Sequence, residues 1–145
     1  MNSWLFIDKP KNITSFKVIQ RLRKILDIKK IGHAGTLDPF ATGILAIAIG
    51  EATKSIHFFN QDKVYNFKVV FGELKDTDDI TGRTIKKSNI IPTYEEINSC
   101  LSMFIGKQEQ VPPLYSAVKV NGKRAYKLAR NNKKFSMKAK NVLIK

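Results

Sequence analysis

The chain of 145 residues is 43% hydrophobic and 26% charged, which is ordinary for a globular domain able to bury a core. Its 26 Lys and Arg residues outnumber its 12 Asp and Glu residues, so the net charge is +14. A single cysteine, Cys100, excludes an internal disulfide and a multi-cysteine zinc site. Asp8 and Lys9 interrupt the apolar start, and no apolar run approaches the roughly 20 residues of a membrane span. We therefore expect a cytoplasmic protein with no membrane segment.

The positive charge is concentrated at the two ends of the chain. Residues 1–31 carry eight Lys or Arg and two acidic residues, and residues 106–145 carry eleven against Glu109 alone. The segment between them is close to neutral. Such a field attracts polyanions, and each phosphate contact makes binding sensitive to salt. The favoured interpretation is nucleic-acid binding, and the alternative is a lysine-rich surface that only keeps the protein soluble.

The first third of the chain alternates between strand and helix signals. Residues 4–7 form a short apolar run that predicts a strand ending at Asp8-Lys9-Pro10. Thr14 or Ser15 can cap a helix that runs to about Leu26, with its apolar residues on one face. The outward residues of that helix are basic: Lys17, Arg21, Arg23 and Lys24. Apolar periodicity stops over 31–43, a buried strand is expected over 44–49, and a helix is expected around 52–59.

The next elements are predicted from alternation and capping signals. Aromatic and β-branched residues recur at every second position over 65–71, which predicts a half-buried strand. Residues 76–79 form a polar turn that ends near Gly82. Thr93 and Glu96 form a capping box for a helix, and Cys100 is expected as a small buried residue on its apolar face.

The last third of the chain begins with a break at Val111-Pro112-Pro113. A strand is expected over 116–120, Asn121-Gly122 is a strong signal for a tight turn, and a helix should begin at Ala125. We find no internal repeat and no linker that would mark a domain boundary. The strands and helices lack the regular rhythm of a doubly wound sheet. The predicted fold is therefore α+β, with a mixed, largely antiparallel sheet flanked by helices.

The glycine-rich loop over 32–43, GHAGTLDPFATG, has the composition of a functional loop. It lacks the Gly-Lys-Ser/Thr ending of a phosphate-binding loop and the dinucleotide fingerprint. Asp38 precedes Pro39, which restricts its backbone to extended conformations. An isolated Asp-Pro is most often an Asx turn, and a lone histidine such as His33 is most often a hydrogen-bonded loop residue. His57 is the only other histidine, so a metal site is poorly supported, and residues 76–79 fail the calcium-loop pattern.

The loop resembles the signature loop of the bacterial tRNA pseudouridine synthase B family. Other segments resemble that family in the same order along the chain: Asp8-Lys9-Pro10 with Thr14-Ser15, residues 50–54, residues 65–72, residues 76–82, and residues 110–130. The resemblance therefore covers almost the whole chain. Asn12 departs from the pattern, since the family usually has glycine there, but asparagine also enters the left-handed region of backbone space.

The resemblance implies a catalytic activity and a role for each matching residue. The activity would be isomerisation of uridine to pseudouridine in the T-arm loop of tRNA, without cofactor or metal. Asp38 would be the catalytic aspartate, and Tyr65 would stack on the target base and take part in proton removal. His33 would contact the T-loop and hold the flipped-out nucleotide. Lys9, with Pro10, matches a structural motif near the site and is also expected to contact RNA. Two residues of the basic C-terminal part, Lys119 and Arg124, are expected to bind RNA as well.

Three interpretations stay open at this point. The chain is a tRNA isomerase, a non-catalytic basic RNA-binding module, or a homologue of the guide-RNA-directed synthases of archaeal and eukaryotic particles. The family's partner arginine for the catalytic aspartate, its later strands and its C-terminal RNA-binding domain have no counterpart up to Lys145. We therefore expect residues 1–145 to be the N-terminal portion of a catalytic domain that needs no obligatory protein partner and is monomeric when full length.

Overall fold

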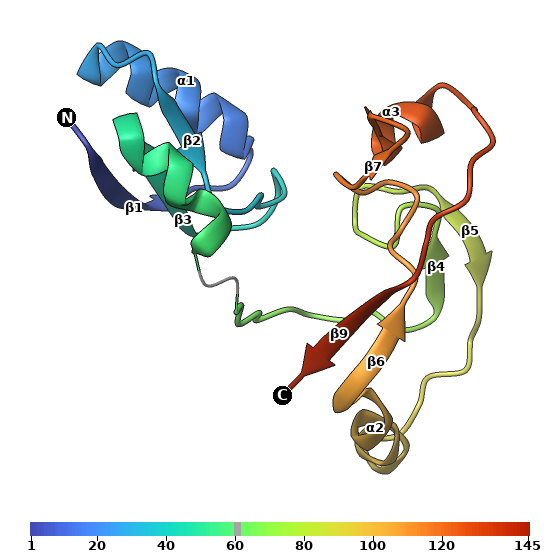
Figure 1. The fold of residues 1–145 in the computed structure, drawn as a ribbon. Helices are drawn as coiled ribbons and strands as arrows, with labels where there is room; N and C mark the ends of the chain where they lie inside the picture. The colour runs from blue at the N-terminus through green and yellow to red at the C-terminus, as the bar shows by residue number, and fades with distance from the viewer. Residues whose placement is uncertain (60–61) are drawn as a thin grey trace. The chain divides into compact units, whose positions relative to one another are not determined.

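The structure, a computed structural model, describes residues 1–59 and 62–145. It divides into two compact units, Met1–Asn66 and Phe67–Lys145, which we call unit 1 and unit 2 (Figure 1). No composition signal in the sequence predicted this division.

Unit 1 is built on a three-stranded antiparallel sheet with the strand order β1-β3-β2. The strands are β1 (Ser3–Lys9), β2 (Ile31–His33) and β3 (Gly43–Ile49). The central strand β3 is the most apolar, and its residues from 45 to 49 are all buried. A helix, α1 (Ser15–Leu26), and a 3-10 helix, η1 (Gly50–Phe58), complete the unit.

The two helices of unit 1 cover opposite faces of the sheet (Figure 1). Side chains alternate between the faces of a strand, so Leu45, Ile47 and Ile49 share one face of β3. They form the core with two residues of α1, Val18 and Ile19. On the other face, a β-carbon added to Gly32 of β2 would lie 3.1 Å from Cδ1 of Ile56 in η1. Glycine at this position therefore lets η1 approach the sheet closely.

Unit 2 consists of two-stranded antiparallel ladders and short helices. The ladders pair β4 (Glu73–Lys75) with β5 (Thr84–Lys87), β6 (Gly106–Gln110) with β9 (Lys140–Ile144), and β7 (Lys119–Val120) with β8 (Lys123–Arg124). The helices are α2 (Tyr94–Leu101), η2 (Ser102–Phe104) and α3 (Ala125–Arg130). Among the described residues of this unit, Ala125 is the only buried hydrophobic residue.

The α+β class and the antiparallel pairing predicted from the sequence are confirmed. The start of α1 at Thr14, the capping box of Thr93 and Glu96, and the turn at Asn121-Gly122 are also confirmed. Asn12 takes φ 63°, as expected of an asparagine that replaces glycine. The segment expected to be a helix at 52–59 is helical, but it is a 3-10 helix that begins at Gly50.

Four expectations about local structure and burial are wrong. Residues 65–71 form no strand and are exposed, because no described strand pairs with them and alternation alone cannot bury a face. Cys100 is exposed, because no described element covers the apolar face of α2. The expected strand at 116–120 is shorter than predicted and consists of β7 alone. Ile31–His33, expected as loop, is a strand because β3 offers it hydrogen bonds.

No described helix is long and apolar enough to cross a membrane.

Candidate functional site

The loop between β2 and β3 carries Asp38, and its backbone is held on both sides of that residue. On one side, the Ser15 hydroxyl donates to the Leu37 carbonyl at 3.1 Å and accepts from the Leu37 N–H at 2.9 Å. Ser15 lies in the first turn of α1 and is 2% exposed. The Leu37 side chain packs against the core of unit 1. A buried hydroxyl and an apolar anchor therefore fix the residue that precedes Asp38.

On the other side of Asp38, the loop is held by Lys9. This lysine is 0% exposed, and its Nζ lies 2.9 Å from the Ile13 carbonyl and 2.6 Å from the Ala41 carbonyl. The carbonyls of Pro10, at 3.0 Å, and Pro39, at 3.4 Å, complete its surroundings. An ammonium has three N–H groups, and these oxygens use all of them.

The RNA contact expected for Lys9 does not fit this burial. The ammonium instead ties the turn after β1 to the loop that carries Asp38. A further hydrogen bond of 2.7 Å, from the Asn12 N–H to the Pro39 carbonyl, joins the same two segments. The sequence could not reveal this arrangement, because lysines are almost always exposed and nothing in the motif indicates where the side chain points.

The Asp38 carboxylate itself is exposed. In an Asx turn this carboxylate would accept a nearby backbone N–H. The turn observed here is instead a backbone one, in which the Ala41 N–H donates to the Asp38 main-chain carbonyl at 3.1 Å. Across the described ranges 1–59 and 62–145, no hydrogen bond or ion pair to the Asp38 carboxylate is found. The structure thus presents a carboxylate available for a substrate, on a loop whose backbone is fixed.

His33 lies at the end of β2, in the sheet next to Ile47 of β3, and is half-buried. Its Nδ1 is hydrogen-bonded to the carbonyl of Gly35. A carbonyl can only accept, so Nδ1 carries the proton, and in the neutral ring Nε2 has the free lone pair. The geometry leaves Nε2 to accept a hydrogen bond from a ligand.

Tyr65 is 66% exposed and belongs to the extended segment 62–70, which has no regular structure. Within the part of the chain that the structure describes, no hydrogen bond or ring contact joins it to Asp38 or His33. The structure therefore brings Asp38 and His33 into one loop region, anchored by Ser15 and Lys9, but does not assign Tyr65 to it.

Lys119 and Arg124 belong to unit 2, where they are directly opposite each other in the β7–β8 hairpin. Both are exposed, and Arg124 also donates to the carbonyl of Ala117. Next to the hairpin lies a pocket of about 310 Å³ that contains four cations and no acid. Its lining residues are Gly122, Lys123, Arg124, Lys127, Leu128, Asn131 and Lys133. Such a surface suits an anion.

Carboxylates with shifted pKa values lie outside the loop. Hydrogen bonds and attraction from Lys30 and Lys54 lower the pKa of Glu51 to about 2. In unit 2, hydrogen bonds from Lys75 and Thr84 and attraction from Lys75 lower the pKa of Glu73 to about 2. No group of three or more His, Cys, Asp or Glu residues that could hold a metal ion is found among the described residues.

A known protein family matches most of the chain. The model of the family described as "TruB family pseudouridylate synthase (N terminal domain)" matches residues 23–145. The chain belongs to this family. Its match begins within α1 and includes β2, the Asp38 loop and all of unit 2. The opening segment that supplies Lys9 and Ser15 precedes the matched region.

Individual relatives extend the similarity to the whole chain. A tRNA pseudouridine synthase B of Ehrlichia ruminantium is 53% identical over 143 residues, which is 98% of this chain and 48% of the relative. That of Rhodospirillum rubrum is 49% identical over 146 residues, covering 100% of this chain and 47% of the relative. The chain thus spans about half the length of these curated relatives.

The fold is also similar to one in a solved structure, titled "Crystal Structure of a Cbf5-Nop10-Gar1 Complex". The TM-score is 0.54 and the sequence identity is 27%. The alignment covers 80% of this chain and 30% of the other chain.

Proposed function

We propose that the chain is the N-terminal part of an enzyme that isomerises uridine to pseudouridine in the T-arm loop of tRNA, with Asp38 as its catalytic residue. The observation that carries this proposal is the exposed, unpaired carboxylate on a backbone held by Ser15 and Lys9. The family and the relatives named tRNA pseudouridine synthase B support the reaction class and the substrate.

The physical requirements of the reaction match these features. A uracil base must leave its stack before its glycosidic bond can be broken, so the enzyme has to hold a flipped-out nucleotide. We propose that His33, through Nε2, accepts a hydrogen bond from that nucleotide, and that Tyr65 provides a face on which the base stacks. Lys119 and Arg124 would bind phosphates, which position the RNA without reading its sequence.

The decisive test is the substitution Asp38→Asn, which keeps the shape of the side chain and removes its charge. Because this chain covers about half of the Ehrlichia ruminantium relative, the assay uses a chimera that joins residues 1–145 to the remaining half of that protein. Release of tritium from C5-labelled uridine in T-arm stem-loop RNA should become undetectable, while RNA binding is retained. The matched control is Asp27→Asn, because Asp27 is exposed at φ 48° and asparagine accepts that conformation. A normal rate in Asp38→Asn would overturn the proposal.

Tyr65 and His33 are separated by two further substitutions in the same chimera. Tyr65→Phe keeps the aromatic face and loses the hydroxyl, so turnover should fall while binding persists. His33→Ala should weaken binding of T-arm RNA more than it slows the step on bound RNA. Equal turnover in Tyr65→Phe would make Tyr65 an ordinary exposed aromatic residue.

Two other functions remain as outcomes of these experiments. If the chain were a non-catalytic RNA-binding module, T-arm RNA would bind but no chimera, including the unsubstituted one, would convert it. The basic pocket of unit 2 is the observation that favours this alternative. A guide-directed enzyme would turn over only when a guide RNA is added. We expect guide-free turnover by a cytoplasmic monomer that needs no metal and no protein partner.

A further inference from the structure

The face of α1 that points away from the core is a continuous basic surface. Ser15, Val18 and Ile19 are the buried residues of α1, and Leu22 and Leu26 pack against the same core. With about 100° of rotation per residue, Lys17, Arg21 and Lys24 fall within about 60° of one another and directly opposite that buried face. All three are exposed. We call these three residues the basic ridge.

Among the described residues of unit 1, no ion pair neutralises the ridge. The first turn of α1 contains no acidic residue. Glu51, which lies beyond β3 at the start of η1, is occupied by Lys30 and Lys54 at 2.6 Å each. Over the described residues, no ion pair involves Lys17, Arg21 or Lys24, although four ion pairs are found elsewhere. The three cations are therefore exposed to solvent, and none has an ion-pair partner among the described residues.

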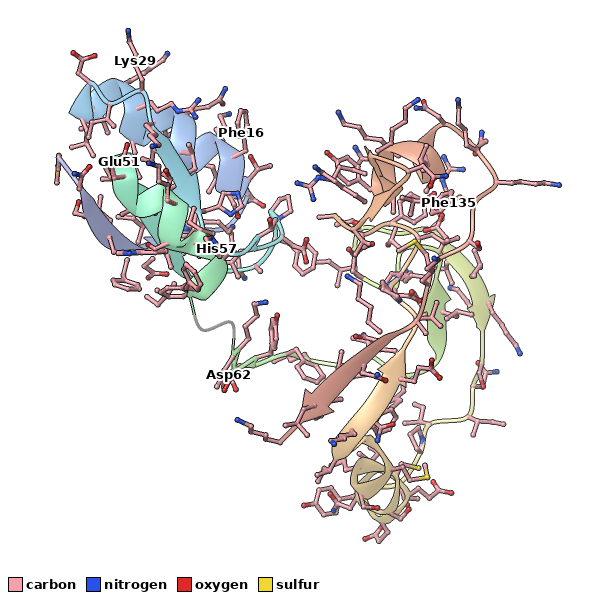
Figure 2. The ribbon with its side chains drawn as sticks, viewed as in Figure 1. Phe16, Lys29, Glu51, His57, Asp62 and Phe135 are labelled. Atoms are coloured by element: carbon pink, nitrogen blue, oxygen red, sulfur yellow. The ribbon has the colours of Figure 1, made fainter. Side chains whose placement is uncertain are left out.

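The ridge begins beside the Asp38 loop and leads away from it. Ser15, two residues before Lys17, is hydrogen-bonded to both backbone groups of Leu37. With a rise of 1.5 Å per residue, Lys24 lies about 10 Å further along the helix than Lys17. Figure 2 labels Phe16, in the first turn of α1, and Lys29, three residues beyond its last residue, Leu26. At the far end, an open hollow of about 440 Å³ is lined by Arg23, Lys24, Asp27, Ile28 and Lys29.

We propose that the basic ridge binds the phosphodiester backbone of the RNA that leads away from the uridine at Asp38. The inference rests on the proposed function, because it takes the Asp38 loop as the place of the target base. Successive cations at intervals of one helical turn can each meet a phosphate as the strand passes along α1. The ridge carries no base-reading geometry, so its contribution is to position the RNA and to strengthen its binding.

The test neutralises the ridge in the 145-residue chain with the triple substitution Lys17→Gln, Arg21→Gln and Lys24→Gln. Glutamine has nearly the same helix propensity as lysine and arginine, so α1 should be retained. The control is a dispersed triple, Lys86→Gln, Lys107→Gln and Lys138→Gln. It removes the same net charge from exposed residues that lie off the ridge. Binding of a T-arm stem-loop RNA is measured for each protein between 50 and 200 mM salt.

The ridge variant should bind more weakly and depend less on salt. Loss of three phosphate contacts lowers the slope of log K against log salt by about 2 to 3. Between 50 and 200 mM salt, the loss of affinity should therefore be about 20- to 40-fold smaller than for the unmodified chain. The dispersed control should keep the slope of the unmodified chain.

Two results separate this inference from the proposed function. Equal slopes in the ridge variant and the dispersed control, with both folded by circular dichroism, would overturn the ridge while leaving the proposed function intact. Failure of both the unmodified chain and the chimera to bind T-arm RNA at any salt concentration would overturn the proposed function, and the ridge with it.

Discussion

Unit 1 and unit 2 differ in whether their secondary structure encloses a core. In unit 1 a sheet lies between two helices, and Leu45, Ile47 and Ile49 are at most 2% exposed. In unit 2 each ladder has only two strands, and large apolar residues such as Ile85, Phe104 and Leu143 are more than half exposed. Two-stranded ladders are marginal in water without something to pack against. Unit 1, which carries Asp38, therefore has a packed core of its own, whereas the described ladders of unit 2 have hydrogen bonds with almost no buried apolar residue.

The exposed apolar residues of unit 2 exceed what an isolated domain normally presents to water. The chain matches about half the length of its curated relatives. We propose that the other half of the catalytic domain supplies strands that cover these residues, together with an arginine that pairs with Asp38.

The largest expected effect is on turnover. Residues 1–145 alone should bind T-arm RNA in a salt-dependent way and not convert it, because a carboxylate closed around a base needs a cationic partner to stay ionised. The chimera with the second half of the Ehrlichia ruminantium relative should convert it. Pseudouridine is measured by mass spectrometry after carbodiimide labelling. Multiple turnover by residues 1–145 alone would mean that unit 1 and unit 2 already contain all that the reaction needs.

The next effect is on hydrogen exchange within the 145-residue chain. Amides of β3 should exchange slowest, because they lie in the centre of a packed sheet. Amides of the β4–β5 and β6–β9 ladders should exchange with little protection, and in the chimera the β6–β9 ladder should become protected. Comparable protection of β3 and β6 in the isolated chain would contradict the contrast between the units.

A smaller effect is expected from removing the buried cation of unit 1. Lys9→Met keeps the length of the side chain but leaves the carbonyls of Ile13 and Ala41 without their donor. Hydrogen bonds to a charged group contribute about 1.5–3 kcal/mol, so unit 1 should lose about that much stability. Trp4, the only tryptophan, is stacked on Phe59 in unit 1 and reports its unfolding in urea. The exposed Lys11→Met is the control, and equal stability of the two variants would show that the Lys9 bonds add nothing.

Ser15→Ala should cost less stability, about 1 kcal/mol, because it removes neutral hydrogen bonds. Its specific effect is on the loop: without the hydroxyl, Leu37 is no longer fixed, and kcat of the chimera should fall while KM for RNA is unchanged. Ser99→Ala in α2 is the control, because the exposed Ser99 hydroxyl also donates to a backbone carbonyl, but to that of Glu96 in its own helix. A change confined to KM would argue against a positioning role for Ser15.

Local sequence signals suffice to predict the structure where three or four neighbouring residues determine it. The Thr14 cap, the Thr93 and Glu96 capping box and the Asn121-Gly122 turn depend on neighbours in sequence, so they could be predicted. The segment 65–71 could not, because a strand exists only when another strand pairs with it.

The candidate site, too, is predictable from the sequence only in part. The Asp38 loop stands out by its glycines and its Asp-Pro step, and the family resemblance supplies the proposed reaction. The burial of Lys9 and the double hydrogen bond of Ser15 depend on how β1, α1 and the loop meet in space. Sequence periodicity does not predict these contacts between distant segments. From the sequence alone, Lys9 and Ser15 are therefore identifiable only as members of a motif.

The smallest expected effect compares one ion-paired carboxylate in each unit at acid pH. Lys30 and Lys54 lower the pKa of Glu51 to about 2 from its ordinary 4.5, so its contribution to stability is present above pH 4.5 and is lost as pH falls toward 2. Because Glu51 is exposed, the effect is small and disappears in high salt. Glu51→Gln should flatten the dependence of unit 1 unfolding on pH over that range, as followed by Trp4 fluorescence.

The matched variant in unit 2 is Glu73→Gln, because the pKa of Glu73 is also about 2 and Glu73 lies in the β4–β5 ladder. It should leave the Trp4 transition unchanged and alter only the amide hydrogen exchange of that ladder. A shift of the Trp4 transition by Glu73→Gln would show that the two units unfold as one.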